Sequence, residues 1–197
     1  IVFFQDTEDI VLSEIKKLNI PFIIADAHTD STNESNNILS ETISADYKLA
    51  SYTAVNYLIE NGHRNIAYIS SSFIPNFYLQ TFEGYKHALD DAQLSVQPSW
   101  IQTNATDETS AYNCMEIILR SRTKPSAVFC TTDMFAIGAI KCANDHGFKI
   151  PDDISFIGID DILLANYITP KLTTIRIDKV KMGTLAMELI ASKIEGN

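Results

Sequence analysis

The stretch 126–161 constrains the fold most, because it has the pattern of a single strand–helix–strand unit. Residues 127–130 (AVFC) are a short apolar run between polar residues, and this pattern predicts a buried strand. Residues 154–159 (ISFIGI) predict a second buried strand. The helical pattern between them stops at Gly147, which suits a left-handed helix end, and Pro151 prevents its continuation.

Side-chain oxygens follow both strands of this unit. Thr131, Thr132 and Asp133 follow the first strand, and Asp160 and Asp161 follow the second. Because a parallel sheet binds ligands at the carboxyl ends of its strands, the pattern predicts a site for a small polar molecule. Capping of the helix is the main role expected for Asp133, with ligand contact as the alternative. Two adjacent acids are costly without a partner, so either a polyhydroxyl ligand or a basic side chain is expected beside Asp160.

The helix predicted over residues 133–146 is apolar almost all round, so it has two faces to bury. One face packs on the sheet. The other is covered either by the rest of the chain or by a second subunit. We expect a homodimer contact centred on Ile137 and Lys141, with Met134 and Ile168 in the same interface.

Strands and helices alternate along the rest of the chain. Apolar runs predict strands at 1–4, 21–26, 65–70, 100–103 and 172–177, and helical spacing predicts helices at 6–18, 46–60, 78–91, 109–120 and 180–194. Residues 28–37 are polar and predict a loop. The alternation predicts an α/β fold with parallel strands and right-handed crossovers.

The composition excludes some classes of protein. The 197 residues carry a net charge of −10, which argues against this segment gripping a phosphate backbone but leaves a separate basic domain open. No apolar run approaches the ~20 residues that span a bilayer. The chain begins inside an apolar strand without Met or a signal peptide, which is typical of a fragment. Cys114, Cys130 and Cys142 are predicted to be reduced core thiols of a cytosolic protein.

Catalytic motifs are missing from the sequence. It contains no GxSxG, HExxH, P-loop or GxGxxG pattern. None of the four histidines, which are His28, His63, His87 and His146, has metal-ligand spacing to a cysteine or a second histidine. We therefore expect no enzyme activity, no cofactor and no metal.

Five segments together resemble the motifs of one protein family. They are 20–26 (IPFIIAD), 57–67 (YLIENGHRNIA), 82–89 (FEGYKHAL), 125–161 (PSAVFC…PDDISFIGIDD) and 170–183 (PKLTTI…MG). These segments resemble the effector-binding region of the LacI/GalR family of bacterial transcription repressors.

The resemblance implies a fold and an organisation. Members carry an N-terminal helix-turn-helix DNA-binding domain, which this chain lacks, before a core of the periplasmic-binding-protein-like type I fold with two Rossmann-like lobes. By analogy, residues 1–63 with 178–197 form an incomplete N-terminal lobe, and residues 64–177 form the C-terminal lobe. The first βα units and a final strand are expected to be missing. Partners implied are a small-molecule effector, a second copy of the chain and operator DNA, with no membrane.

The resemblance also places the family's ligand contacts on this sequence. They fall on Asp26, Ala27, Thr81, Thr106, Thr132 and Asp160, with Ile177 at a crossover between lobes. Many members have an arginine at the position of Thr81 and an aromatic residue near Ala27 or Thr106. The small residues here argue against a hexopyranose stacked at those positions, or an anion held by that arginine. Phe73, Phe77 or Tyr78 is the alternative source of a ring.

Two functions follow from these observations. The first is the effector-binding domain of a cytoplasmic repressor that senses a sugar or a similar polar metabolite. The second is a transport-type sugar-binding protein of the same fold that acts outside the membrane. The segments GHRNIA, PDDISFIGIDD and LTTI favour the repressor.

Overall fold

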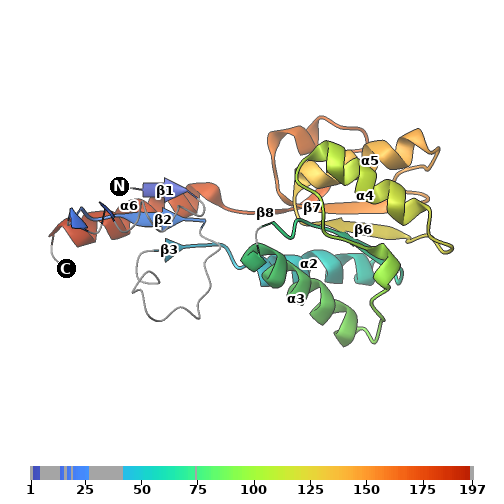
Figure 1. Ribbon diagram of the computed structural model, residues 1–197, viewed down its shortest axis with the longest axis horizontal. Helices are drawn as coiled ribbons and strands as arrows, with labels where there is room; N and C mark the ends of the chain where they lie inside the picture. Colours follow the sequence, from blue (N-terminus) through green and yellow to red (C-terminus); the bar gives the residue numbers. More distant parts are fainter. Residues whose placement is uncertain are drawn as a thin grey trace. The chain divides into compact units, whose positions relative to one another are not determined.

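The structure is a computed structural model that describes residues 2–4, 14–15, 17–18, 20–26, 42–73 and 75–195. The chain divides into two compact units, Ile1–Ala45 with Asp178–Asn197, and Asp46–Ile177 (Figure 1). Each unit is built on its own parallel sheet. The prediction of an α/β fold with parallel strands is therefore confirmed.

The larger unit contains a five-stranded sheet in the order β5-β4-β6-β7-β8. Its strands are β4 (Ile66–Ile69), β5 (Ile101–Gln102), β6 (Ala127–Cys130), β7 (Ser155–Asp160) and β8 (Thr173–Arg176). All neighbouring strands are parallel. β4 and β6 are buried along their whole length, as expected for the centre of a sheet covered on both faces.

Helices cover both faces of this sheet. α2 (Tyr47–Glu60) and α3 (Pro75–Asp91) lie on one face, and α4 (Glu108–Leu119) and α5 (Asp133–Asp145) lie on the other (Figure 1). Short 3-10 helices, Pro98–Trp100 and Leu163–Asn166, complete the unit.

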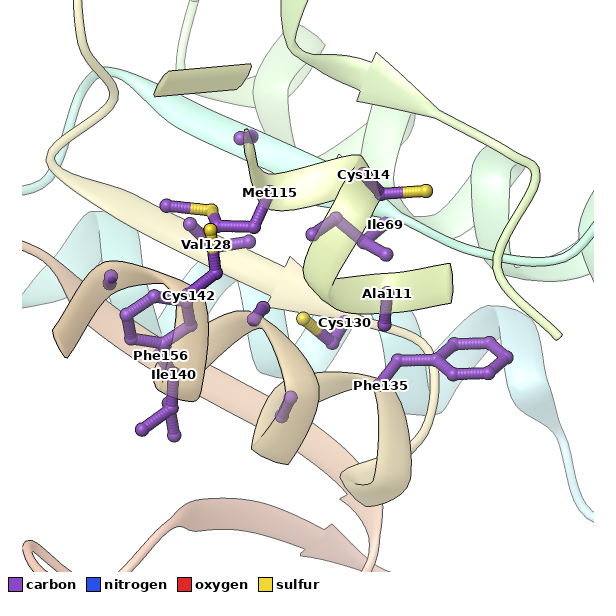
Figure 2. Packing of buried hydrophobic residues seen from close by; sticks show 14 of the residues in the cluster. Ile69, Ala111, Cys114, Met115, Val128, Cys130, Phe135, Ile140, Cys142 and Phe156 are labelled. Carbon is purple, nitrogen blue, oxygen red and sulfur yellow. The ribbon is translucent and has the colours of Figure 1, made fainter. Parts of the chain in front are cut away.

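One side of the sheet packs under α4 and α5 through a continuous apolar core. Val128 and Cys130 of β6 meet Met115 of α4 and Cys142 of α5 in this layer (Figure 2). Cys114 lies in the same layer, and all three cysteines are buried and unpaired. Their prediction as free core thiols is confirmed.

The other side of the sheet packs under α2 and α3 through aromatic rings. Tyr68 of β4 is fully buried, and its ring centroid lies 5.0 Å from that of Tyr85 and 5.5 Å from that of Phe82. The Tyr85 hydroxyl donates to the carbonyl oxygen of Ile66 at 2.8 Å. Each edge-to-face or tilted ring pair of this kind stabilises the fold by about 0.5–1.5 kcal/mol, beyond the contribution of the apolar area that it buries.

The smaller unit has a three-stranded parallel sheet, β1 (Val2–Phe4), β2 (Ile23–Ala25) and β3 (Thr42–Ile43), in that order. α6 (Lys179–Glu195) packs on it through Ala186 and Ile190, which contact Ile23. The loop predicted over residues 28–37 and most of the helix predicted over 6–18 lie outside the described residues. In the part of the chain that the structure describes, no helix is both long and apolar enough to span a bilayer.

The boundary between the units differs from the one expected at residues 63 and 64. The larger unit begins at Asp46, so α2 belongs to it and not to the N-terminal lobe. The reason is packing, because α2 buries Ala50, Ala54 and Val55 in contact with α3 and the five-stranded sheet. The second boundary falls between residues 177 and 178, at the position that the resemblance implies.

Candidate functional site

Polar residues gather at the carboxyl edge of the five-stranded sheet, because all five strands end there. They are Ser70, Ser71 and Ser72 after β4, Asn104 and Thr106 after β5, Thr131 and Thr132 after β6, Asp160 and Asp161 at the end of β7, and Arg176 at the end of β8. Ligands of open α/β sheets bind at this edge.

The hydroxyl groups closest to the sheet hold its strand ends together. Ser70 and Thr131 are fully buried, and the Thr131 hydroxyl donates to Ser70 Oγ at 3.1 Å. The backbone N–H of Thr131 continues the ladder by donating to the carbonyl oxygen of Ile69 at 3.0 Å. These two hydroxyls satisfy each other's hydrogen-bonding capacity inside the fold, as buried polar groups require.

Asp160 and Asp161 turn the chain sharply at the end of β7. Their φ angles are 120° and 53°, in the left-handed half of conformational space that residues other than glycine rarely adopt. Both side chains are half-buried. Asp161 Oδ2 accepts a hydrogen bond from Arg176 Nε at 2.5 Å. The basic side chain expected beside this acidic pair is therefore that of Arg176, and it bonds Asp161.

Asp133 is a buried carboxylate and not a helix cap, so that prediction was wrong. The N-cap of α5 is Thr132, whose Oγ1 accepts from the N–H of Phe135 at 3.2 Å. An N-cap needs an extended backbone, and Thr132 has it, with φ −139° and ψ 156°. Asp133 already lies inside the first helical turn.

The carboxylate of Asp133 bonds two segments beyond its own helix. Oδ1 accepts from the Thr174 hydroxyl at 2.6 Å, and Oδ2 accepts from the N–H of Ile162 at 2.9 Å. Burial raises the pKa of Asp133, and these two hydrogen bonds act in the opposite direction. Gly158 of β7 leaves space for the carboxylate, since a Cβ added there would lie 2.2 Å from Oδ1.

Thr81 has a packing role, and the structure does not support its prediction as a ligand contact. Thr81 belongs to α3, and its side chain is fully buried. Its hydroxyl bonds the carbonyl oxygen of Phe77 and the Tyr68 hydroxyl, both at 2.8 Å. Phe77 is also buried, whereas Phe73, close to the end of β4, is 72% exposed. Of the alternative rings, Phe73 is therefore the most accessible.

The remaining predicted contacts lie at element ends. Thr106 is exposed just before α4, and its N–H donates to Ser110 Oγ at 2.8 Å. Ile177 is half-buried and ends the larger unit. Asp26 follows β2 in the smaller unit with φ 60°. Ala27 lies outside the described residues.

The residues predicted for a dimer contact share the outer side of α5 and the segment after β7. Met134 is 37% exposed, Ile137 is half-buried, and Lys141 pairs with Asp145 at 2.7 Å. Ile168 is partly buried against the apolar core of its own chain. Three further apolar side chains are exposed in this segment, namely Leu163, Leu164 and Tyr167.

Two residues of β8 were not predicted to belong to the site. Thr174 bonds Asp133, and Arg176, two positions later on the strand, bonds Asp161. Their spacing of two, before the end of a strand, was the available signal.

Within the described ranges, no cluster of three or more His, Cys, Asp and Glu side chains is arranged to hold a metal ion.

A parallel α/β unit with polar side chains at the carboxyl ends of its strands is the architecture in which open sheets bind small ligands. Residues 55–197 match the family of periplasmic binding protein-like domains. The chain belongs to this family, as an effector-binding domain of the LacI type.

Known relatives agree with that assignment. The HTH-type transcriptional repressor PurR of Histophilus somni (strain 129Pt) is 38% identical over 143 residues, which cover 73% of this chain and 43% of the repressor. A LacI-family regulator from Enterococcus faecium, solved with bound ribose, has 28% identity and a TM-score of 0.83 over 96% of this chain and 68% of its own. A transcription regulator from Lactobacillus plantarum reaches a TM-score of 0.88 at 24% identity, over 100% of this chain and 72% of its own, which supports the fold alone.

The chain spans less than half the length of the first of these relatives. By their names, the Histophilus somni and Enterococcus faecium proteins are regulators of transcription. The domain is accordingly a ligand-binding domain of the LacI-family regulators, without an enzymatic role.

Proposed function

We propose that this chain is the effector-binding and dimerisation domain of a LacI-family transcriptional repressor, which senses a small polar metabolite such as a sugar or sugar derivative. The observation that carries the proposal is the position of the Asp160 carboxylate at the carboxyl end of β7. The neighbouring acid, Asp161, bonds Arg176. A carboxylate at such an edge accepts short, charge-assisted hydrogen bonds from ligand hydroxyl groups.

Small polar side chains around the same edge support a hydroxylated ligand. Thr132 is half-buried and Thr106 is exposed. The exposed ring of Phe73 offers an apolar surface for a sugar face. The ribose bound to the Enterococcus faecium regulator makes pentoses a reasonable first group to test.

The regulatory part of the proposal is lobe movement. An effector with unequal affinity for two lobe arrangements shifts their populations by the difference in binding free energy. We propose that this shift reaches operator DNA through a homodimer and a helix-turn-helix domain outside this chain, in the cytoplasm. Relatives named HTH-type transcriptional repressor PurR support a repressor function over that of a transport-type binding protein.

Homodimerisation is proposed through the outer side of α5. Met134 of α5, and Leu163 and Tyr167 of the segment after β7, are exposed apolar side chains. Lys141, one helical turn after Ile137, adds a charge to the same helix, where it pairs with Asp145. A contact surface with an apolar centre and a charged rim is typical of stable protein–protein interfaces.

Calorimetry and thermal denaturation against a defined panel would test ligand sensing. The panel contains ribose and other pentoses, hexoses, their phosphates and nucleobases. A ligand at 100 times its Kd stabilises the folded state by about 2.7 kcal/mol, so true binding raises the melting temperature measurably. Absence of any response across the panel would count against the proposal.

Substitution of Asp160 identifies the site. Asp160→Ala is expected to abolish the ligand response while the far-UV circular dichroism spectrum stays unchanged. Asp152→Ala is the matched control, because Asp152 is an exposed acid just before β7, at the other end of that strand. An unchanged response in Asp160→Ala would remove Asp160 from the site.

A further inference from the structure

A buried carboxylate, that of Asp133, holds the turn after β7 in addition to the bond between Asp161 and Arg176. Asp160 and Asp161 both have positive φ angles, and such a conformation persists in residues other than glycine only where neighbouring groups impose it. The next residue, Ile162, donates its N–H to Asp133 Oδ2 at 2.9 Å. Asp133 thus bonds the backbone of the residue that directly follows the two strained residues in the chain.

A second connection reaches the same carboxylate through Thr174. The N–H of Asp161 donates to Thr174 Oγ1 at 3.3 Å, and the Thr174 hydroxyl donates to Asp133 Oδ1 at 2.6 Å. The hydroxyl has one proton, and its direction is therefore fixed by the carboxylate acceptor. The two backbone N–H groups after Asp160 are therefore both connected to Asp133. The N–H of Ile162 bonds it directly, and the N–H of Asp161 is connected to it through the Thr174 hydroxyl.

The surroundings of Asp133 are built for this arrangement. Its side chain is fully buried, so its two hydrogen bonds are not exposed to competition from water. Gly158, two residues before Asp160, admits the carboxylate, because any Cβ at that position would lie 2.2 Å from Oδ1. β7, α5 and β8 therefore meet at one side chain.

We propose that Asp133 is a positioning residue for Asp160. Its carboxylate fixes the backbone turn that sets the direction of the Asp160 side chain, and it does so without touching the ligand. The inference rests on the proposed function in one respect, namely that Asp160 binds the effector. Loss of Asp133 then weakens effector binding through a change of geometry at Asp160.

The direct test is NMR spectroscopy of the isotopically labelled chain without ligand. Amide exchange at Asp161 and Ile162, and the φ-dependent coupling between the amide and Cα protons of Asp160 and Asp161, report the turn itself. In Asp133→Asn, one acceptor oxygen is replaced by an NH₂ group. We expect exchange at Ile162 to increase at least tenfold and the positive-φ couplings to change. The matched control, Asp145→Asn, removes an exposed carboxylate from the same helix and should change neither.

A purely structural role predicts a different result. Amides throughout the unit, including that of Val128 in the central strand, would then exchange faster together. Such a uniform increase, or an unchanged turn in Asp133→Asn, would overturn the inference.

A second pair of variants covers the case in which Asp133→Asn does not fold. Thr174→Val removes the hydroxyl that links Asp161 to Asp133, and Thr174→Ser retains it. Faster exchange at Asp161 is expected in the valine variant, with recovery in the serine variant. Equal exchange in both variants would contradict the inference.

Ligand binding separates this inference from the proposed function. Ribose is the first probe, and any panel member that stabilises the unmodified chain replaces it. A tenfold or greater loss of affinity in Asp133→Asn, with the NMR change at the turn, supports positioning. If the turn changes while Asp160→Ala binds normally, the proposed site at Asp160 fails and the positioning of the turn stands.

Discussion

The Thr174 hydroxyl donates a 2.6 Å hydrogen bond to Oδ1 of Asp133, a residue 41 positions earlier in the chain. The bond joins the last strand of the five-stranded sheet to the first turn of α5. Because the acceptor is a fully buried carboxylate, breaking this contact costs more than breaking an exposed one. The carboxyl edge of the sheet is therefore stabilised by a buried side-chain hydrogen bond as well as by the backbone hydrogen bonds between its strands.

Gly158→Ala is expected to destabilise the fold. The new methyl group would lie 2.2 Å from Oδ1 of Asp133, so the carboxylate must move away from Thr174. Overpacking of a core typically costs about 1–3 kcal/mol. Urea denaturation followed by fluorescence measures the change in the free energy of unfolding.

The control for this substitution is Gly183→Ala in α6. A Cβ added at Gly183 meets no atom of the described residues within 4 Å, and alanine favours a helix over glycine by about 0.5–1 kcal/mol. The two alanine variants should therefore change stability in opposite directions. Equal stability of Gly158→Ala and the unmodified chain would contradict the packing around Asp133.

Thr81→Val is expected to lower the free energy of unfolding by about 0.5–1.5 kcal/mol, because the buried Tyr68 hydroxyl loses one of its hydrogen-bond partners, at 2.8 Å. Thr53→Val is the control. The Thr53 hydroxyl also bonds a carbonyl one helical turn earlier, that of Leu49 at 2.7 Å, but it is exposed. Its loss should change stability by less than about 0.5 kcal/mol. Thermal and urea denaturation of both variants would test the packing role of Thr81, and equal effects would argue against it.

The sequence predicted the parallel architecture well, for a physical reason. Residues 127–130 and 154–159 are apolar runs bounded by polar residues, and β6 and β7 occupy Ala127–Cys130 and Ser155–Asp160. A strand buried on both faces needs such a run. Local pattern was sufficient because each strand is defined by its own burial.

Roles that depend on residues far apart in the chain were harder to predict from the sequence. Thr132 and Asp133 are both good N-caps by residue type, and only the backbone angles decide between them. The function of Thr174 depends on the register between β7 and β8, which places Gly158 opposite it. Burial of Thr81 depends on how α3 is rotated on the sheet. None of these is encoded in spacing along one segment.

His63 is expected to make stability depend on pH. Burial lowers its pKa below the ordinary value of 6.5, so the unfolded chain binds a proton where the folded chain does not. Its contribution to stability is complete above pH 6.5 and decreases as the pH falls from 6.5 through the folded pKa. His63→Gln should therefore lose part of this pH dependence.

Urea denaturation at pH 7.5 and at pH 5.5 measures the effect of His63. Nδ1 of His63 lies 3.0 Å from Ser126 Oγ, and glutamine retains hydrogen-bonding capacity at this position. His87→Gln is the control, because His87 is exposed on α3 and its removal leaves His63 in place. If the two variants lose the same share of the pH dependence, the assignment to His63 is wrong.

Ile137→Glu is expected to weaken dimerisation at least tenfold. If α5 forms the subunit contact, Ile137 is buried there, and glutamate would replace apolar area worth about 1.5–3 kcal/mol with a charge that has no partner. Sedimentation velocity over a range of concentrations measures the dissociation constant. Leu79→Glu is the control, since Leu79 is 50% exposed on α3, which covers the opposite face of the sheet. If Leu79→Glu weakens association as much as Ile137→Glu does, or if the unmodified chain stays monomeric at every concentration, α5 is not the subunit contact. If only Ile137→Glu dissociates, then Asp133, at the start of the same helix, connects the turn at Asp160 to the subunit interface through a single side chain.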